Sequence, residues 1–167
     1  MNPLLEKTKQ AVMNKADKRI HPVIMKLVNA GKQVIYSEKT RELSLKQIGD
    51  GKDPEMVGAA IAKLIGVLYN QSKKTAPMQA MIPAAVILLC EVLQFLEDAG
   101  SIKVDSNLLA SYTQSMASSV LQVFGVTPDK LQGMMDKQRA SSPAIGTPPA
   151  PAGGPPAGGI LAQTGAM

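Results

Sequence analysis

Two single-copy residues are the first candidates for chemistry in this sequence. The chain has one histidine, His21, and one cysteine, Cys90, so serine–histidine catalysis would have to rest on His21 and a thiol nucleophile on Cys90. His21 precedes Pro22 at an expected helix break, with no serine, cysteine or acid cluster placed to work with it. Cys90 ends the apolar run 84–90, where a thiol packs as a small hydrophobic side chain and its thiolate is disfavoured. We expect a capping or solvated His21 and a core Cys90.

The segment Gly49-Asp50-Gly51-Lys52-Asp53 has the composition of a phosphate-binding or calcium-binding loop. A P-loop needs longer glycine spacing and a Lys followed by Ser or Thr, and a calcium loop needs a Glu at its twelfth position. Neither pattern can be completed here, so we interpret the segment as a turn followed by a helix cap. One Cys and one His also exclude a Cys/His zinc cluster. We therefore expect no catalytic residue, no metal site and no cofactor.

The elements that carry these residues are predicted to be helices. Of the 167 residues 45% are hydrophobic but only 3% aromatic, which predicts one domain at most, with an aliphatic core. Acceptor side chains, in two cases followed by proline, mark helix starts at Asn2-Pro3, Asp53-Pro54 and Asp105. The expected helices cover residues 3–20, 22–48, 54–71, 78–98, 106–124 and 128–139. The sequence thus predicts an all-α bundle of five or six helices over residues 1–140.

The second of these helices has its weak point at Gly31, and Pro22 is expected to end or kink the first. Beyond the bundle, residues 141–159 contain six of the twelve prolines, five of the fourteen glycines and no charge. Such a segment cannot form a core, so residues 141–167 are predicted to be an extended or disordered arm. Its apolar end, residues 160–167, is a candidate docking peptide.

Two of the expected helices, 54–71 and 106–124, carry narrow faces of small side chains at four-residue spacing. Small side chains let two helix backbones approach closely, in lipid or in a protein core. We interpret these faces as contacts for oligomer formation or helix packing. Their members are Gly58, Ala62, Gly66, Ser111, Ser115 and Ser119.

Residues 56–96 form a central apolar helical hairpin in this interpretation. Residues 56–69 contain one charge, Lys63, and residues 80–96 contain one, Glu91. Neither stretch qualifies as an autonomous membrane span, since 80–96 is short and includes Pro83 and Glu91. The hairpin is expected to pack inside a soluble oligomer. Alternatively it lines an oligomeric channel, with Lys63 and Glu91 facing the lumen or an interface.

Positive charge is concentrated at the start of the chain. Residues 1–48 hold ten Lys and Arg against four acids, a net charge of +6, and the remainder has a net charge of −1. A basic helical end can face the phosphates of lipid head groups or nucleic acid, and a solvated face is an equally open interpretation. The candidate contacts are Lys7, Lys9, Lys15, Lys18 and Arg19.

Four runs carry a resemblance to a known family. They are Ala30-Gly31-Lys32 with Tyr36-Ser37-Glu38-Lys39-Thr40, Asp53-Pro54, Leu68-Tyr69-Asn70-Gln71-Ser72-Lys73, and Ile82-Pro83-Ala84-Ala85-Val86-Ile87-Leu88-Leu89-Cys90-Glu91. Over about residues 25–130 the chain resembles small virion structural proteins of tailed bacteriophages, and it looks most like the smaller ejection proteins of short-tailed phages. The resemblance implies a non-enzymatic protein stored in the capsid or tail. Such a protein leaves with the genome and assembles a conduit through the host envelope.

We therefore expect a bacteriophage ejection protein that self-associates into a ring or conduit. Its expected partners are other copies of itself and other virion proteins, with the host membrane and DNA, through non-specific electrostatics, as further candidates. Its expected location is the virion, and the host cell envelope after ejection. Two alternatives stay open: a structural virion adaptor or decoration protein without a membrane role, and a basic DNA-binding module.

Overall fold

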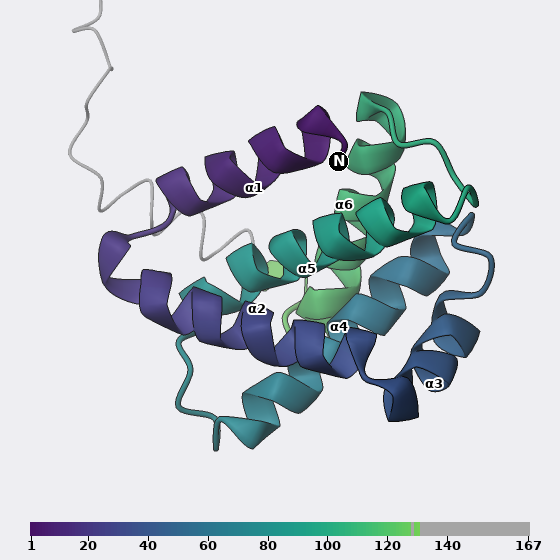
Figure 1. The fold of residues 1–167 in the computed structure, drawn as a ribbon. Coiled ribbons are helices and arrows are strands. Elements are labelled where there is room, and N and C mark those ends of the chain that lie inside the picture. Colours follow the sequence, from purple (N-terminus) through teal and green to yellow (C-terminus); the bar gives the residue numbers. More distant parts are fainter. Residues whose placement is uncertain (128, 131–167) are drawn as a thin grey trace, which may run out of the picture. The chain divides into compact units, whose positions relative to one another are not determined.

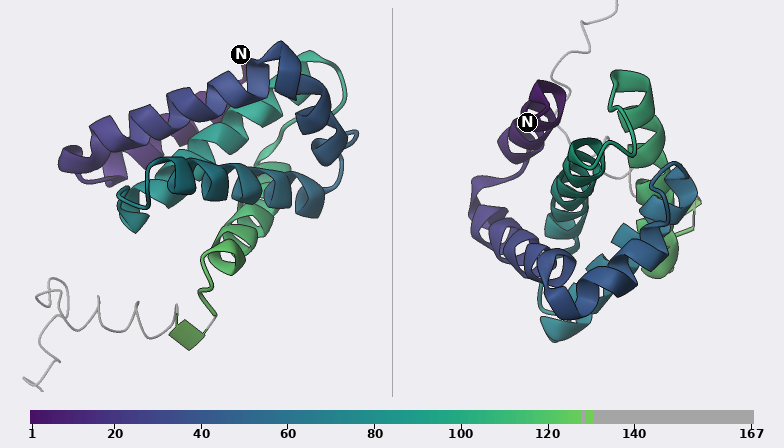
Figure 2. Two further views of the ribbon diagram at one scale, coloured as in Figure 1. Left: turned by 90° about the horizontal axis from the view of Figure 1, so that it is seen from below. Right: turned by 45° about the vertical axis from the view of Figure 1, so that its right-hand side comes forward.

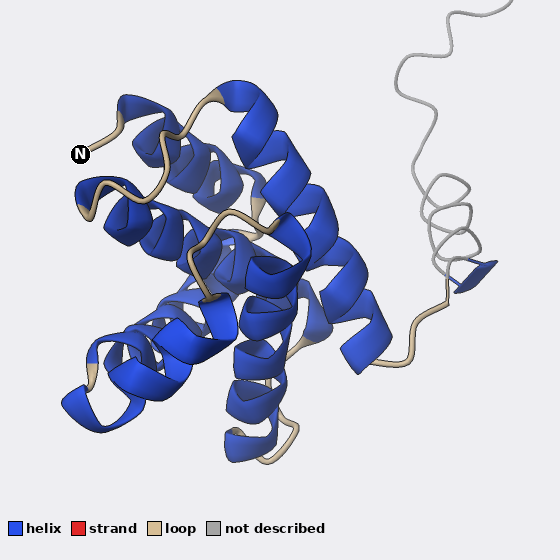
Figure 3. Cartoon of the chain, turned by 90° about the vertical axis from the view of Figure 1, so that its right-hand side faces the viewer, coloured by secondary structure: helices blue, strands red, loops and turns tan. Residues whose placement is uncertain are grey.

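The computed structural model describes residues 1–127 and 129–130. Residues 1–127 are all-helical, with six α-helices, one 3₁₀-helix and no strand (Figure 3). The elements are α1 (Pro3–Lys15), η1 (Lys18–Ile20), α2 (His21–Tyr36), α3 (Glu38–Ile48), α4 (Pro54–Gln71), α5 (Met78–Asp98) and α6 (Ser106–Val123). The predicted all-α class is confirmed.

The three predicted helix starts form by side-chain capping. The Asn2 side chain accepts a hydrogen bond from the Leu4 amide at the start of α1. Asp53 caps α4 in the same way, and Asp105 caps α6. Each side-chain oxygen satisfies an amide that has no partner within the first helical turn. These signals are local in sequence, which is why they could be predicted.

The first helix is five residues shorter than the prediction of 3–20. It ends at Lys15, because Ala16 is extended and Asp17 begins a new turn. The Asp17 carboxylate accepts a hydrogen bond from the Arg19 amide and starts η1, which leads directly into α2. The chain therefore leaves α1 and starts the next turn at Asp17, five residues before Pro22, where the break was predicted.

The prediction of a single helix over 22–48 is wrong, because Ser37 is extended and separates α2 from α3. The predicted weak point, Gly31, lies inside α2 and is buried. The break lets α3 fold back on the bundle, where the Arg41 guanidinium lies 5.6 Å from the centre of the Phe95 ring of α5. Tyr36 packs edge-on against the same ring. A straight helix would have kept Arg41 away from α5.

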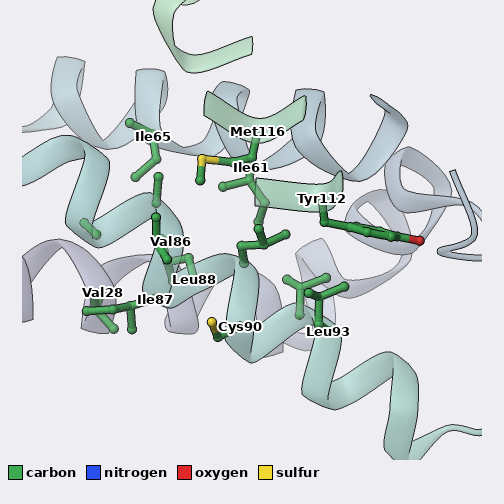
Figure 4. Close-up of a cluster of buried hydrophobic side chains, with 14 of the residues drawn as sticks. Val28, Ile61, Ile65, Val86, Ile87, Leu88, Cys90, Leu93, Tyr112 and Met116 are labelled. Atoms are coloured by element: carbon green, nitrogen blue, oxygen red, sulfur yellow. The ribbon is translucent and has the colours of Figure 1, made fainter. Parts of the chain in front are cut away.

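The core of the bundle is built around α5. This helix lies among α1, α2, α4 and α6 and contacts all four (Figures 1 and 2). Twelve of its residues are buried, and they meet side chains such as Val28, Ile61 and Met116 from the surrounding helices (Figure 4). The apolar run predicted around 81–90 is therefore the interior of a single chain. The most extensive partner of α4 is α6, so the predicted hairpin of α4 and α5 is one of several contacts in the bundle.

Residues Met1–Thr127 form one compact unit, and Pro128–Met167 form a second. Of the second unit the structure describes Asp129 and Lys130, both helical and exposed. The rest of the helix predicted over 128–139 lies outside the described residues, as does the predicted arm 141–167.

Candidate functional site

A cluster of four charged side chains joins three helices at one side of α5. Glu91 of α5 accepts a hydrogen bond from Lys9 Nζ of α1 at 2.8 Å and forms an ion pair with Lys32 Nζ of α2 at 3.1 Å. Lys9 also reaches Glu6 one turn earlier on α1, at 2.6 Å. We call these four residues the charged node. It is the candidate functional site because Glu91 is the one charged residue between Lys74 and Glu97, within the most apolar part of the chain.

The central pair of the node, Glu91 and Lys9, is largely removed from water, whereas Glu6 and Lys32 are about a third exposed. The side chains of Glu91 and Lys9 are 15% and 16% exposed, and that of Lys32 is 38% exposed. Burial lowers the pKa of Lys9, but the bonds to Glu6 and Glu91 outweigh it, so the pKa of Lys9 is raised above its ordinary value. Taking one partner away would leave a partly buried charge with fewer partners, which costs more than losing an exposed pair. The node therefore fixes α1 and α2 to α5.

A groove of about 400 Å³ lies beside the node, between α1 and α2. Its floor includes Glu91 and Ile87 of α5, and its sides include Met13 of α1 and Met25 of α2. Met25 is 45% exposed, so this seam between α1 and α2 is not closed to solvent. The two helices cover α5 here through one charged cluster and a partly open apolar seam.

Lys63 does not join Glu91. It is exposed on α4 and lines a different groove, of about 580 Å³, between α3 and α4. The two charges interpreted together as lumen or interface candidates therefore have different surroundings in the folded chain. Leu43 and Val67, which are 59% and 49% exposed, line the second groove, which the sequence analysis missed. On α3, Leu45 and Ile48 share one face of the helix, and Leu43 lies on another side. A leucine away from the apolar face is a sequence signal for an exposed apolar surface.

The two small-residue faces meet at one point within the chain, where Gly58 of α4 lies against Ser115 of α6. A Cβ atom placed on Gly58 of α4 would lie 2.7 Å from the Met116 backbone nitrogen and 2.8 Å from the Ser115 carbonyl carbon of α6. A Cβ on Gly66 would lie 3.0 Å from a methyl group of Val123. Ala62 is fully buried, Ser115 and Ser119 are half-buried, and Ser111 is exposed. Gly58 and Ser115 thus form a helix-packing contact inside the bundle and are not free to form a subunit contact.

The residues first considered for chemistry make contacts that support the fold. His21 Nε2 lies 3.1 Å from the Ala16 carbonyl oxygen, just past the end of α1. Cys90 is fully buried in the core. Within the turn 49–53, Gly51 accepts a hydrogen bond from the Tyr112 hydroxyl, and its φ of 75° suits glycine. Among the described residues no group of three or more His, Cys, Asp and Glu side chains could hold a metal ion.

The five basic candidates of the first third of the chain separate in the structure. Lys9 is engaged in the node, whereas Lys7, Lys15 and Lys18 are exposed. Arg19 is exposed and paired with Asp17 at 2.7 Å. Hydrogen bonds from Arg19, together with its charge, lower the pKa of Asp17 to about 2, and the pKa of Arg19 is raised by the same carboxylate.

One helix of the described chain, α5, is long and apolar enough to cross a membrane, judged by length and composition alone. It has 21 residues, and 67% of its most apolar stretch is buried in the bundle. A core helix of a water-soluble protein meets the same criterion, so the bundle accounts for α5 as it stands. Residues 80–96 alone are too short for a membrane span, whereas the whole helix, Met78–Asp98, is long enough.

In comparisons with known proteins, no family model, no curated protein and no solved structure matches the chain.

Proposed function

We propose that this chain is a non-enzymatic virion protein of the ejection type. It is stored as the folded bundle, and it opens at a host membrane so that α5 enters the bilayer and several copies surround a conduit. The observation that carries the proposal concerns α5. This helix is long enough to span a membrane, and its one mid-helix charge, Glu91, is paired with Lys9 of α1 and Lys32 of α2. The resemblance to small virion proteins of short-tailed phages supports the same function.

Opening the bundle requires separating α1 from α5. Only Leu5 of α1 is fully buried, and the node supplies the ion pair between the two helices. Elsewhere, Asn2 bonds to the side chains of Gln94 and Glu97 at the far end of α5. Other apolar side chains of this segment, Leu4, Val12, Met13 and Ala16, are only partly buried, so α1 is cheaper to release than α4, which is joined backbone to backbone to α6 at Gly58.

Self-association follows from the same residues. Once Lys9 and Lys32 leave Glu91, this carboxylate needs a polar environment within an apolar helix. A water-filled lumen or a contact with another copy supplies it. We therefore propose that the chain is a monomer in water and an oligomer in lipid, with Glu91 facing the lumen or the neighbouring subunit.

The test is release of a trapped dye from liposomes by purified full-length protein. Lys9→Met weakens the node, whereas Lys7→Met removes the same charge from an exposed position on the same helix. We expect the wild type to release dye, Lys9→Met to release it several-fold faster, and Lys7→Met to match the wild type. Mass photometry of protein extracted from the liposomes would give the size of the oligomer.

Absence of dye release with all three proteins would overturn the ejection function. Incorporation into particles without any lipid activity would then favour the virion adaptor. Binding to duplex DNA that falls steeply with salt, without lipid activity, would favour the DNA-binding module. Equal release by Lys9→Met and Lys7→Met would contradict the role given to the node.

A further inference from the structure

One end of the bundle is strongly basic. The end of α1, η1 and the first half of α2 lie at the same side of the molecule as the loop between α4 and α5 (Figures 1 and 2). A groove of about 450 Å³ is shared by Lys26 and Leu27 of α2 and by Ser72 and Thr75 of that loop, so the two segments are neighbours. We call this the basic end. Its exposed cations are Lys15, Lys18, Arg19, Lys26, Lys73 and Lys74.

Almost no negative charge opposes these cations. The one carboxylate in these segments is Asp17, which is paired with Arg19 at 2.7 Å. Helix α2 has no acidic residue, and none occurs between Glu55 and Glu91. The basic end therefore has a net charge of +5 from residues that are far apart in sequence and close in the fold. The turn between α3 and α4 and the end of α5 lie at the opposite end (Figure 1). They carry Asp50, Asp53 and Asp98 with Lys52 as the one cation among them, so the charge of the unit is polarised.

The loop holds two of the cations in a backbone conformation that lysine rarely adopts. Lys73 and Lys74 have φ angles of 54° and 60° and are the only non-glycine residues with positive φ in the described part of the chain. Glycine or asparagine would adopt this conformation at lower cost. Both side chains are exposed, so packing gives no reason for lysine here. Their positive charge is the property left to explain the choice.

Exposed apolar side chains follow these lysines along the chain. Met78 and Ile82, in the first turns of α5, are 42% and 43% exposed. Cations beside exposed apolar groups are the surface that proteins present to a charged lipid interface, where head groups take the cations and the acyl boundary takes the apolar side chains. A nucleic-acid surface gives no reason for Met78 and Ile82 to be exposed. The aromatic residue beside this loop, Tyr69 of α4, is half-buried and packed edge-on against Phe124, so its ring is not free for base stacking.

We propose that the basic end docks on anionic lipid head groups, with Lys73, Lys74 and Lys26 on the phosphates and Ile82 at the acyl boundary. Docking in this orientation brings the amino-terminal end of α5, the one helix of membrane-spanning length in the described residues, to the bilayer surface first. This inference deepens the proposed function and rests on it for its biological setting. The binding itself is tested independently.

The experiment is sedimentation of full-length protein with vesicles of phosphatidylglycerol and phosphatidylcholine, compared with vesicles of phosphatidylcholine alone. Lys73→Asn/Lys74→Asn removes two charges and keeps a residue that tolerates positive φ. Lys39→Asn/Lys46→Asn on α3, at the other end of the unit, removes two charges as a matched control. We expect binding to anionic vesicles only, weakened about 30-fold by the loop pair and less than about threefold by the control pair.

A second variant separates lipid from nucleic acid. Ile82→Ser should weaken binding to anionic vesicles and leave binding to a duplex DNA oligonucleotide unchanged. Equal losses with the loop pair and the control pair would overturn the docking orientation. Binding to DNA with none to vesicles would assign the basic end to nucleic acid and overturn the inference.

Dye release measured on the same samples separates the two proposals. Vesicle binding that depends on the loop lysines without dye release would sustain the docking inference and overturn the conduit. Dye release that is unaffected by the loop pair would sustain the conduit and overturn the docking inference.

Discussion

Lys9 shows how little of a side chain's role is set by its type. It belongs to the same basic run as Lys7 and Lys15, yet its ammonium bonds to Glu6 and Glu91 while Lys7 and Lys15 are exposed. The difference comes from the position of Glu91, which is 82 residues away and on another helix. Membership of the charged node is therefore what distinguishes Lys9 from the exposed lysines of the same helix.

We predict that Lys9→Met lowers the free energy of unfolding by about 1.5 kcal/mol, because Glu91 stays partly buried and keeps only Lys32. Lys7→Met should change it by less than about 0.5 kcal/mol, as an exposed substitution does. Urea denaturation followed by circular dichroism measures both. Similar values for the two variants would mean that the node adds nothing to stability.

The two lysines with positive φ give a second prediction at this scale. Lys74→Gly removes the steric cost of the left-handed conformation and should stabilise the fold by up to about 1 kcal/mol, part of which is offset by the flexibility of glycine when unfolded. The corresponding rise in melting temperature is about 3 °C. The control is Lys63→Gly, inside α4, which should destabilise by about 1 kcal/mol. A lower melting temperature for Lys74→Gly would show that the loop backbone is not strained.

Among the elements, α4 and α6 make the closest contact. The backbone of α6 at Ser115 and Met116 lies directly over Gly58, and backbone cannot rotate away as a side chain does. Gly66, two turns later, faces only the side chain of Val123, which is 47% exposed. The two glycines have the same spacing pattern in sequence and different roles in packing.

Gly58→Ala should therefore lower the free energy of unfolding by about 2 kcal/mol, because forcing the two helix backbones apart costs more than the added methyl group gains in helix propensity. Gly66→Ala is the matched control, and its gain in helix propensity, about 1 kcal/mol, offsets the small shift of Val123. Thermal melts of both variants test this. A neutral Gly58→Ala would contradict the close approach of α4 and α6.

For the whole molecule, four shifted groups predict weakening at alkaline pH, and one of them is the buried Cys90 thiol, whose pKa burial raises to about 11. The pKa of Lys9 is raised above 10.5, so its contribution is complete below that pH and is lost as pH rises through the folded-state value. Burial raises the pKa values of Tyr36 and Tyr112 above 10.0, and unfolding releases their protons more easily in the same range. The melting temperature should fall from about pH 9 upward, and Lys9→Met should fall less steeply. A flat profile between pH 9 and 11.5 would contradict these shifts.

The sequence by itself determined the all-α class, the starts of α1, α4 and α6, and the bounds of α4 and α5. These depend on capping side chains, prolines and apolar periodicity, which act within a few residues of each other. The break at Ser37 was missed because its cause lies elsewhere: Ser37 makes no side-chain capping bond, and α3 is held by packing such as Arg41 on Phe95. The groove at Leu43 was also missed, because the sequence does not say which helices lie beside Leu43.

Only the tertiary structure decided which helices meet. It placed Lys9 and Lys32 on Glu91, it set Gly58 against α6 of the same chain, and it gathered Lys26 with Lys73 and Lys74 at one end. A sequence pattern states that a face is small, apolar or charged, but the same face can be satisfied by a helix of its own chain, by another copy or by lipid. The choice depends on long-range packing, in which the burial of α5 by four neighbouring helices outweighs the preference of any single helix.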